Sequence, residues 1–501
     1  MERSTAILGA LVAYLVGLLL LGVMAQRRTR DADDFYLGGR TLGPWVAALA
    51  ANASSSSAWS LVGASGFAYK FGLASLWLIP GCIGGFVLNW FFVAPRLRDR
   101  TGSAITLTEF LAGPREAPGH LPLAITASVL TLLSLATYVA AQMQAAGSAF
   151  THAFATQQTL GVLLGAAVTI AYTLLGGYLA ASITDTLQGL LMVGVAVLVP
   201  AAAVAHLGGF GGFVDAVAAV DAPGFQDLTS THEGGAAIAF ALGLCGIALG
   251  YPGQPHAVNK FMGMAPGASM TIARSVGIGW AVILYLGMIV LGLAARASWT
   301  LPAGAHEDAL YEASRHLLPP LVDGIVLASV LAAIMSTVDS QLLVCASSMT
   351  HDLGLAYRHP DRALLLARTT VLGIGIAATV AALLLPKNVF DNVLFAWAAL
   401  GSSLGPLLLV RLWRGPVAPN WALASMLVGG LGAIAGFYWP VLGPGFADRV
   451  LSWAAALALA LLGSRRAGPT FATQLAVADR PMVASIAANP RHAPAPSKPE
   501  P

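Results

Sequence analysis

Hydroxyl and carboxyl side chains are concentrated in one long apolar stretch, LAAIMSTVDSQLLVCASS, at residues 331–348. Ser336 and Ser340 are four residues apart, so in a helix they would share one face. Thr337 and Asp339 flank that face. An ionisable side chain within an apolar span is energetically costly, which makes Asp339 a functional-site hypothesis by default. The alternative interpretation places Asp339 near the inner end of a long helix, where water would solvate it.

A second acidic residue, Asp185, lies in the stretch GGYLAASITDTLQG beside three hydroxyl-bearing residues, Ser182, Thr184 and Thr186. Its alternative role is that of a helix N-terminal carboxylate, because the helix dipole favours acidic residues at that end. No basic residue interrupts either apolar stretch. Hydroxyl, carboxylate and carbonyl oxygens are the ligands that a hard cation such as Na⁺ prefers. The two stretches together therefore predict a cation site.

Two further apolar stretches are interrupted near their middle. AANASSSSAWSLVGASG, at residues 51–67, contains four consecutive serines, and GYPGQPHAVNKF, at residues 250–261, contains two prolines and two glycines. Non-helical backbone is tolerated at membrane depth only where it lines a cavity or packs against protein. Interruptions at corresponding places in two halves indicate a transporter with a central site. The alternative is that small residues merely let helices pack closely, but a serine run matched by a proline–glycine break favours a binding site.

The composition indicates an all-α polytopic membrane protein. The 501 residues are 57% hydrophobic and 10% charged, with a mean hydropathy of +0.75, whereas soluble proteins carry about 25% charged residues. Apolar runs recur at the length of about 20 residues that a membrane-spanning helix requires. They predict about thirteen spans, at residues 5–25, 43–69, 73–95, 121–150, 157–177, 183–205, 236–260, 269–295, 318–349, 364–386, 389–411, 419–440 and 446–464.

The interruptions divide these spans into two groups of five. Repeat one covers residues 43–205 and repeat two covers residues 236–411, with a first helix at 5–25 and two last helices within 419–464. An odd number of spans in each repeat inverts the second relative to the first. The membrane domain thus covers residues 1–466, and the Ala- and Pro-rich residues 467–501 are expected to form a disordered cytoplasmic tail. The first run could instead be a signal peptide, but it lacks a cleavage site, so we expect an uncleaved span.

The distribution of positive charge predicts the orientation of the chain. With the N-terminus outside and the C-terminus in the cytoplasm, 20 of the 26 lysine and arginine residues lie on the inner side. The long connection at residues 207–235 contains neither residue type, as expected for an external loop. Arg40 is either one of these inner anchors or a residue with a specific role at the start of the interrupted span.

Five stretches give the chain a resemblance to the sodium:solute symporter family, and within it to the bacterial sodium/proline symporters. They are DDFYLGGRTLGPW (33–45), TLTEFL (106–111), YTLLGGYLAASITDTLQG (172–189), GYPGQPH (250–256) and AAIMSTVDSQLLVCASS (332–348). The resemblance implies a LeuT-like fold with five-plus-five inverted repeats. It also implies a multi-pass protein of the bacterial inner membrane that uses Na⁺ to import a small organic solute, most readily proline or another amino acid.

The resemblance also implies a set of sodium ligands. The main sodium site would comprise backbone oxygens and hydroxyls from Ala53, Ser56, Ala333, Ser336 and Thr337. Some members have a second cation site on the cytoplasmic side, whose matching positions here are Asp185, Ser336, Asp339 and Ser340. Relatives often have serine where this chain has Asp339. The extra carboxylate would either strengthen the second site or remain protonated and permit a proton-coupled route.

Substrate contacts are implied for residues of the two interruptions and the fourth span, namely Ser55, Ser57, Gln142, Ile247, Tyr251 and Pro255. Two of these depart from the proline symporters, which have an aspartate in place of Ser55 and a tryptophan in place of Ile247. Gln142 would face the cavity together with Tyr138, four residues before it, or would instead form a hydrogen bond between helices. These departures leave another solute open, such as pantothenate, a carboxylate or a sugar.

Other classes of protein fit the sequence less well. A sensor built on a transporter fold would carry a long C-terminal signalling region, and a channel would move ions without coupling them to a solute. The sequence shows no phosphate-binding loop, metal cluster or catalytic triad that would indicate an enzyme. The expected partners are a small-molecule substrate and membrane lipid, with no nucleic acid and no obligate protein partner.

Overall fold

The computed structural model describes residues 3–26, 40–102, 104–175, 178–355, 362–384, 386, 388–440, 443 and 445–465. Within these ranges the chain is helical, apart from connections and one isolated bridge between Leu42 and Met264. The predicted tail at 467–501 and the first residues of the DDFYLGGRTLGPW stretch lie outside the described residues. The all-α class is confirmed.

The first third of the chain contains one continuous span followed by a series of short helical segments. These are α1 (Arg3–Gln26), α3 (Pro44–Ser55), η2 (Trp59–Gly63), α4 (Ala64–Phe71), η3 (Gly72–Trp77), η4 (Ile79–Ile83), α5 (Gly84–Leu88), η5 (Asn89–Val93), α6 (Ala94–Arg100) and α7 (Leu107–Ala112). The first predicted interruption is therefore present, between α3 and η2.

Longer helices follow. They are α8 (His120–Phe154), α9 (Gln158–Leu175), α10 (Tyr178–His206), α11 (Gly209–Ala218), α15 (Met270–Ser298), α16 (Ala309–Leu317), α17 (Pro320–Ser347), α19 (Ala363–Leu384), α20 (Val389–Arg414), α21 (Pro419–Tyr438) and α22 (Ser452–Arg465). Short turns are η7 (His306–Asp308), η8 (Ser348–Asp352) and η10 (Ala447–Leu451). The second interruption divides one span into α12 (Gly234–Cys245), α13 (Ile247–Gly250), η6 (Tyr251–Gly253) and α14 (Pro255–Met262).

The number of spans differs from the expected thirteen. Among the described residues, ten helices are long and apolar enough to cross a membrane, or eleven if the pair Trp59–Trp77 and Ile79–Arg100, bent by 69°, forms one span. The count of thirteen is therefore not confirmed. The difference falls on α9, whose apolar part is short, and on residues 44–100, where the interruptions divide the chain.

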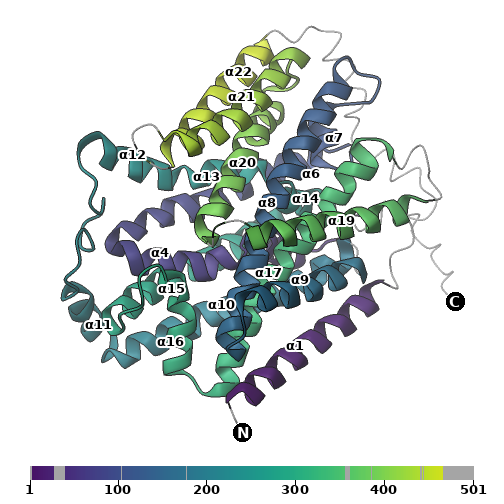
Figure 1. The fold of residues 1–501 in the computed structure, drawn as a ribbon. Coiled ribbons are helices and arrows are strands. Elements are labelled where there is room, and N and C mark those ends of the chain that lie inside the picture. The colour runs from purple at the N-terminus through teal and green to yellow at the C-terminus, as the bar shows by residue number, and fades with distance from the viewer. Residues whose placement is uncertain are drawn as a thin grey trace, which may run out of the picture.

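Helix α17 occupies the centre of the bundle, where α1, α3, α8 and α10 all pack against it. Every residue from Val326 to Ser348 is buried. In Figure 1, α21 and α22 lie together at one edge beside α20, and α1 lies at the opposite edge. The polar face of α17 is thus enclosed by protein on all sides, and its hydroxyl and carboxyl groups must find their partners within the bundle.

The second interruption packs directly against α20 because both elements carry glycine at the crossing. A Cβ atom on Gly401 would lie 2.4 Å from the Cα atom of Gly250, and a Cβ atom on Gly250 would lie 2.2 Å from Nε1 of Trp397. Real Cβ atoms do not approach other heavy atoms this closely. The contact of α20 with the end of α13, directly before η6, therefore depends on the absence of side chains at Gly250 and Gly401.

We expect the Gly401→Ala substitution to destabilise the protein by about 1–3 kcal/mol, because the added methyl group meets backbone that cannot move aside easily. The melting temperature of the purified protein in detergent measures this effect. The matched control is Gly279→Ala in α15, where an added Cβ atom meets nothing within 4 Å. Equal melting temperatures for the two variants would contradict the close packing of Gly250 against α20.

Candidate functional site

Oxygen atoms of α3 and α17 converge at the first interruption. Ser336 donates its hydroxyl to the carbonyl oxygens of Ala53 and Ala333, each at 3.2 Å. Thr337 Oγ1 lies 3.4 Å from the same carbonyl oxygen of Ala53. Four of the five predicted main-site residues are therefore in contact. The fifth, Ser56, adjoins them, since its backbone nitrogen donates to the Ala53 carbonyl at 3.3 Å.

The serine run explains why α3 ends here. Ser54 and Ser55 donate their hydroxyls to the carbonyls of Ala50 and Ala51, four residues earlier, at 2.7 and 2.9 Å. Such bonds compete with the regular helix ladder and bend or weaken helices. Ser56 then adopts an extended conformation, with φ −120° and ψ 90°. The carbonyl end of α3, which carries the negative end of the helix dipole, thus points at the hydroxyls of α17.

A second group of oxygens lies beside the first and surrounds a buried ion pair. Lys260 Nζ lies 2.9 Å from Asp185 Oδ2 and 3.2 Å from Ser182 Oγ. Ser54 Oγ lies 3.2 Å from Asp185 Oδ2 and 3.1 Å from Ser340 Oγ. Although no basic residue interrupts the Asp185 stretch itself, α14 supplies one from elsewhere in the chain. Asp185 also lies about two turns inside α10, so it is not a helix N-terminal carboxylate.

Asp339 is buried and is not solvated at a helix end, since only 1% of its surface is exposed. Within the described part of the chain, neither carboxyl oxygen has a hydrogen-bond partner. The charges of Asp185 and Lys260 both act on it. An unpaired buried carboxylate is costly, so Asp339 depends on the positive charge of Lys260 for compensation or carries a proton.

The predicted substrate residues of the first half gather at the α3 interruption, with one exception. Gln142 Oε1 accepts a hydrogen bond from the backbone nitrogen of Ala58 at 3.1 Å, and Ser57 Oγ lies 3.2 Å from Tyr138 OH. Gln142 and Tyr138 therefore both face the interruption. Ser55 differs, because its hydroxyl bonds to carbonyls within α3.

The predicted substrate residues of the second half lie close by. Tyr251 OH is 3.3 Å from Tyr285 OH, which in turn is 3.1 Å from Ser60 Oγ beyond the first interruption. Ile247 contributes its carbonyl oxygen, which accepts a hydrogen bond from Trp397 Nε1 at 3.2 Å. Pro255 occupies the first turn of α14, where its missing N–H costs nothing. A chain of hydroxyl groups thus connects the two interruptions.

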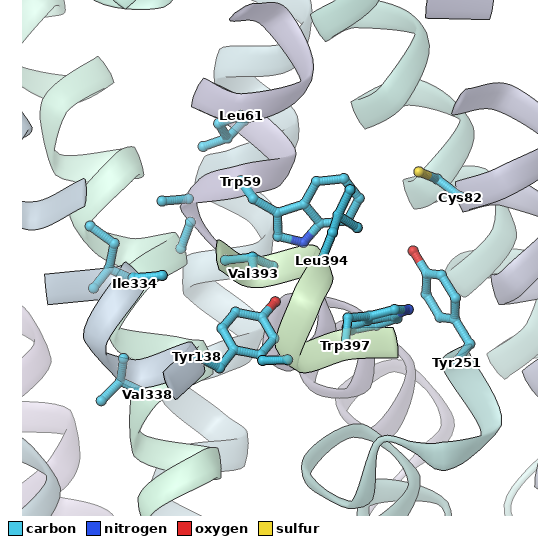
Figure 2. Close-up of a cluster of buried hydrophobic side chains, with 14 of the residues drawn as sticks. Trp59, Leu61, Cys82, Tyr138, Tyr251, Ile334, Val338, Val393, Leu394 and Trp397 are labelled. Carbon is cyan, nitrogen blue, oxygen red and sulfur yellow. The ribbon is translucent and has the colours of Figure 1, made fainter. Parts of the chain in front are cut away.

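Aromatic rings line the space around these groups. Figure 2 shows Tyr138, Trp397 and Tyr251 in a row beneath Trp59, with ring centroids 6.5 Å apart for Tyr138 and Trp397 and 4.7 Å apart for Tyr251 and Trp397. Sequence reasoning missed Trp59, Tyr285 and Trp397. Trp59 lies two residues after the last serine of the run, which was a usable signal. Nothing local to Tyr285 or Trp397 distinguishes them from other buried aromatic residues.

Two cavities approach the site from opposite ends. The aromatic cavity has a volume of about 430 Å³ and is lined by Phe67, Lys70, Phe71, His232, Phe240, His306, Phe390 and Arg449, among others. The Lys260 cavity has a volume of about 20 Å³, room for about one water molecule, and is lined by Ile105, Thr106, His256, Lys260, Ser340 and Ser347, among others. The stacked rings of Phe67 and Phe390, 5.0 Å apart, and Trp59 beside Phe390 separate the aromatic cavity from the interruption.

Two interrupted helices, a converging set of uncharged oxygens and cavities at either end define a membrane transporter with a LeuT-like fold. The model of the sodium:solute symporter family matches residues 35–429. The chain belongs to this family. It is a sodium-coupled transporter of a small solute, located in a membrane, and not an enzyme.

Its relatives include proline transporters. The osmoregulated proline transporter OpuE of Bacillus subtilis is 34% identical over 488 residues, covering 93% of this chain and 97% of the relative. The sodium/proline symporter of Escherichia coli is 33% identical over 448 residues, covering 87% and 88%. Among solved structures, a Na⁺-coupled sialic acid symporter in a substrate-bound outward-open state has the same fold, with a TM-score of 0.77, 19% identity, and coverage of 93% and 99%.

Removal of one partner of the buried ion pair should destabilise the protein strongly. We expect Asp185→Asn or Lys260→Met alone to cost about 3–5 kcal/mol, because each leaves one buried charge unpaired, whereas the double variant should recover most of that loss. Melting temperatures of the unmodified protein, the two single variants and the double variant in a sodium-free choline buffer measure these losses. The matched control is Asp99→Asn at the exposed pair with Arg98, expected to cost under about 1 kcal/mol. Losses that simply add in the double variant would show that the two groups are not coupled.

Proposed function

We propose that this chain imports a small amino acid, with proline as the first candidate, together with Na⁺. The observation that carries the proposal is the convergence of α3 carbonyl and α17 hydroxyl oxygens beside an interruption lined by aromatic rings. The proline transporters among the relatives, which span nearly the whole chain, support the choice of solute.

The main sodium ion would be held by the carbonyl oxygens of Ala53, Ser56 and Ala333 and the hydroxyls of Ser336 and Thr337. These groups are uncharged and buried, and they are oxygen donors of the kind that replaces the water shell of a hard cation. In the structure, Ser336 and Thr337 point their hydroxyls at the Ala53 carbonyl. With the ion, the same carbonyl would turn from accepting hydrogen bonds to coordinating Na⁺.

Sodium binding would order the substrate site because the two sites share the interruption. The ion would join the end of α3 to α17 and so fix Ser56. The next residues, Ser57 and Ala58, contact Tyr138 and Gln142. A ligand can shift a conformational equilibrium only by its differential affinity for the two states. Here sodium would bind more tightly to the conformation in which the end of α3 lies against α17, because only that conformation brings the oxygen ligands of the two helices together.

The solute would occupy the space between the interruptions. Trp59 Nε1 and Gln142 Nε2 are buried donors without a partner among the residues that the structure describes, and both suit a carboxylate oxygen. The rings of Tyr138, Trp397 and Tyr251 offer an apolar surface for a compact side chain. Ser55 and Ile247 contribute less, since one bonds within its own helix and the other offers only its carbonyl here.

The orientation proposed from the charge distribution places the aromatic cavity outside and the Lys260 cavity on the cytoplasmic side of a bacterial inner membrane. Inward movement of one net positive charge releases about 2.3 kcal/mol per 100 mV of membrane potential. Because tenfold accumulation requires about 1.4 kcal/mol, one sodium ion for each zwitterionic solute molecule is sufficient for uptake against a gradient.

We expect Thr337→Ala to raise the sodium concentration for half-maximal uptake by about 10- to 100-fold, because it removes one oxygen from the ion. Thr337→Ser keeps the hydroxyl and should behave like the unmodified protein. Solute uptake into proteoliposomes over a range of sodium concentrations measures both variants. An unchanged sodium dependence in Thr337→Ala would remove this residue from the sodium site.

We expect radiolabelled proline to accumulate in proteoliposomes under an inward sodium gradient and not under a choline gradient. Unlabelled proline should compete, and replacement of Na⁺ by Li⁺ or by a proton gradient tests ion selectivity. If pantothenate, a carboxylate or a sugar accumulates and proline does not, the proposed solute is wrong but the proposed sodium symport stands. Uptake driven by protons alone would point instead to a coupling role for Asp339.

A further inference from the structure

The buried ion pair lies in a group of oxygens of the kind that holds a hard cation. Asp185, Ser54, Ser182 and Ser340 present an acidic oxygen and three hydroxyls within one hydrogen-bonded group. We infer that Lys260 is a tethered cation that fills this position permanently, so that the transporter binds and carries one sodium ion and not two. The inference rests on the sodium-coupled uptake proposed above, and it specifies how many sodium ions bind to each protein molecule.

The ammonium group of Lys260 is held from several sides. It contacts the Asp185 carboxylate and the Ser182 hydroxyl, and it lies 4.8 Å from the centre of the Tyr178 ring, a cation–π distance. Only 1% of the lysine surface is exposed. A lysine is almost never this deeply buried unless it is paired. Its position is therefore as well defined as that of a bound ion.

A sodium ion cannot share this position with the ammonium group. Two positive charges at contact distance repel each other strongly in the interior of a protein, where the effective dielectric constant is well below that of water. The Asp185 carboxylate, the strongest oxygen ligand of the group, is already neutralised by its pair with Lys260. Asp339, on the neighbouring helix α17, is a second buried carboxyl group close enough for the charges of Asp185 and Lys260 to act on it.

The tethered cation also joins three helices beside the cavity on the predicted cytoplasmic side. Lys260 belongs to α14 and Asp185 to α10, and Ser54 of α3 bonds to the same carboxylate oxygen. The Lys260 cavity reaches the ammonium group between Tyr178 and Ser340. When this cavity widens, a sodium ion from the main site can leave, whereas the lysine stays covalently attached. One charge therefore returns with the protein in every cycle.

A purely structural ion pair would show the same contacts, but it would have no effect on how many sodium ions bind. The two roles are separated by counting bound ions in the full-length protein, purified in detergent at pH 8 with no solute present. Binding of ²²Na⁺ at saturation is the measurement. It does not require the solute to be known, so failure to transport proline would leave the result interpretable.

We expect one sodium ion per protein molecule for the unmodified chain and for Lys260→Arg, which retains the positive charge. Lys260→Met should bind two, a twofold increase, because the vacated carboxylate and hydroxyls then accept sodium. Asp185→Asn combined with Lys260→Met should return to one. In Lys260→Met, sodium should also raise the melting temperature more than in the unmodified protein, since it replaces the missing charge.

Two results would overturn the inference. Binding of two sodium ions by the unmodified protein, with Lys260 in place, would show that the lysine does not occupy the second position. Binding of one sodium ion by a folded Lys260→Met variant would show that the pair is structural. If Lys260→Met does not fold, Lys260→Gln, which retains a polar side chain, replaces it in the comparison, and a folded Lys260→Gln variant that still binds one sodium ion overturns the inference in the same way.

Discussion

The interrupted span can exist only if the backbone carbonyl oxygens at the end of α3 find hydrogen-bond partners inside the bundle. When a helix stops inside a membrane, its last carbonyl groups lose their partners, and no water or lipid group can replace them. Here the carbonyl of Ala53 is satisfied by two hydroxyls of α17 and by the backbone nitrogen of Ser56. This arrangement is sufficient to permit the interruption but weak enough for an ion to displace, because each contact is a neutral hydrogen bond of 3.2 Å or longer.

The rest of the bundle keeps that interruption in place. α17 can present hydroxyls to α3 only because α1, α8 and α10 enclose it, so that its polar groups have no alternative partners. On the other side, the second interruption lies against α20 through paired glycines, which brings Tyr251 next to Trp397. The hydroxyl chain from Tyr251 through Tyr285 to Ser60 then joins the two interruptions. A conformational change at one interruption therefore reaches the other through these direct contacts.

The sequence predicted those parts of the site that depend on local pattern. Breaks at membrane depth were sufficient to predict both interruptions, and helical spacing predicted that Ser336 and Ser340 share a face. That Ser336 and Thr337 face Ala53 was implied only by the resemblance to the symporter family. The number of spans was less predictable, since apolar length does not show where short helical segments divide the chain, as they do between residues 44 and 100. The Asp185 partner was missed for a physical reason. From the sequence, Lys260 is only one of the 20 basic residues counted on the inner side, and the fold is needed to show that α14 places it inside the bundle.

The two groups of oxygens illustrate different ways of holding positive charge in a medium of low dielectric constant. The group around Ala53 contains no acid, so an ion there retains its charge and can leave when the helices separate. The group around Asp185 contains a carboxylate, which would hold a free ion far more strongly and would remain as an uncompensated buried charge after release. A lysine resolves this difficulty because it compensates the carboxylate and, being covalently attached, does not leave with the solute. The exchangeable ion is then bound by the weaker, uncharged ligands alone, and this is the condition under which its release can be fast.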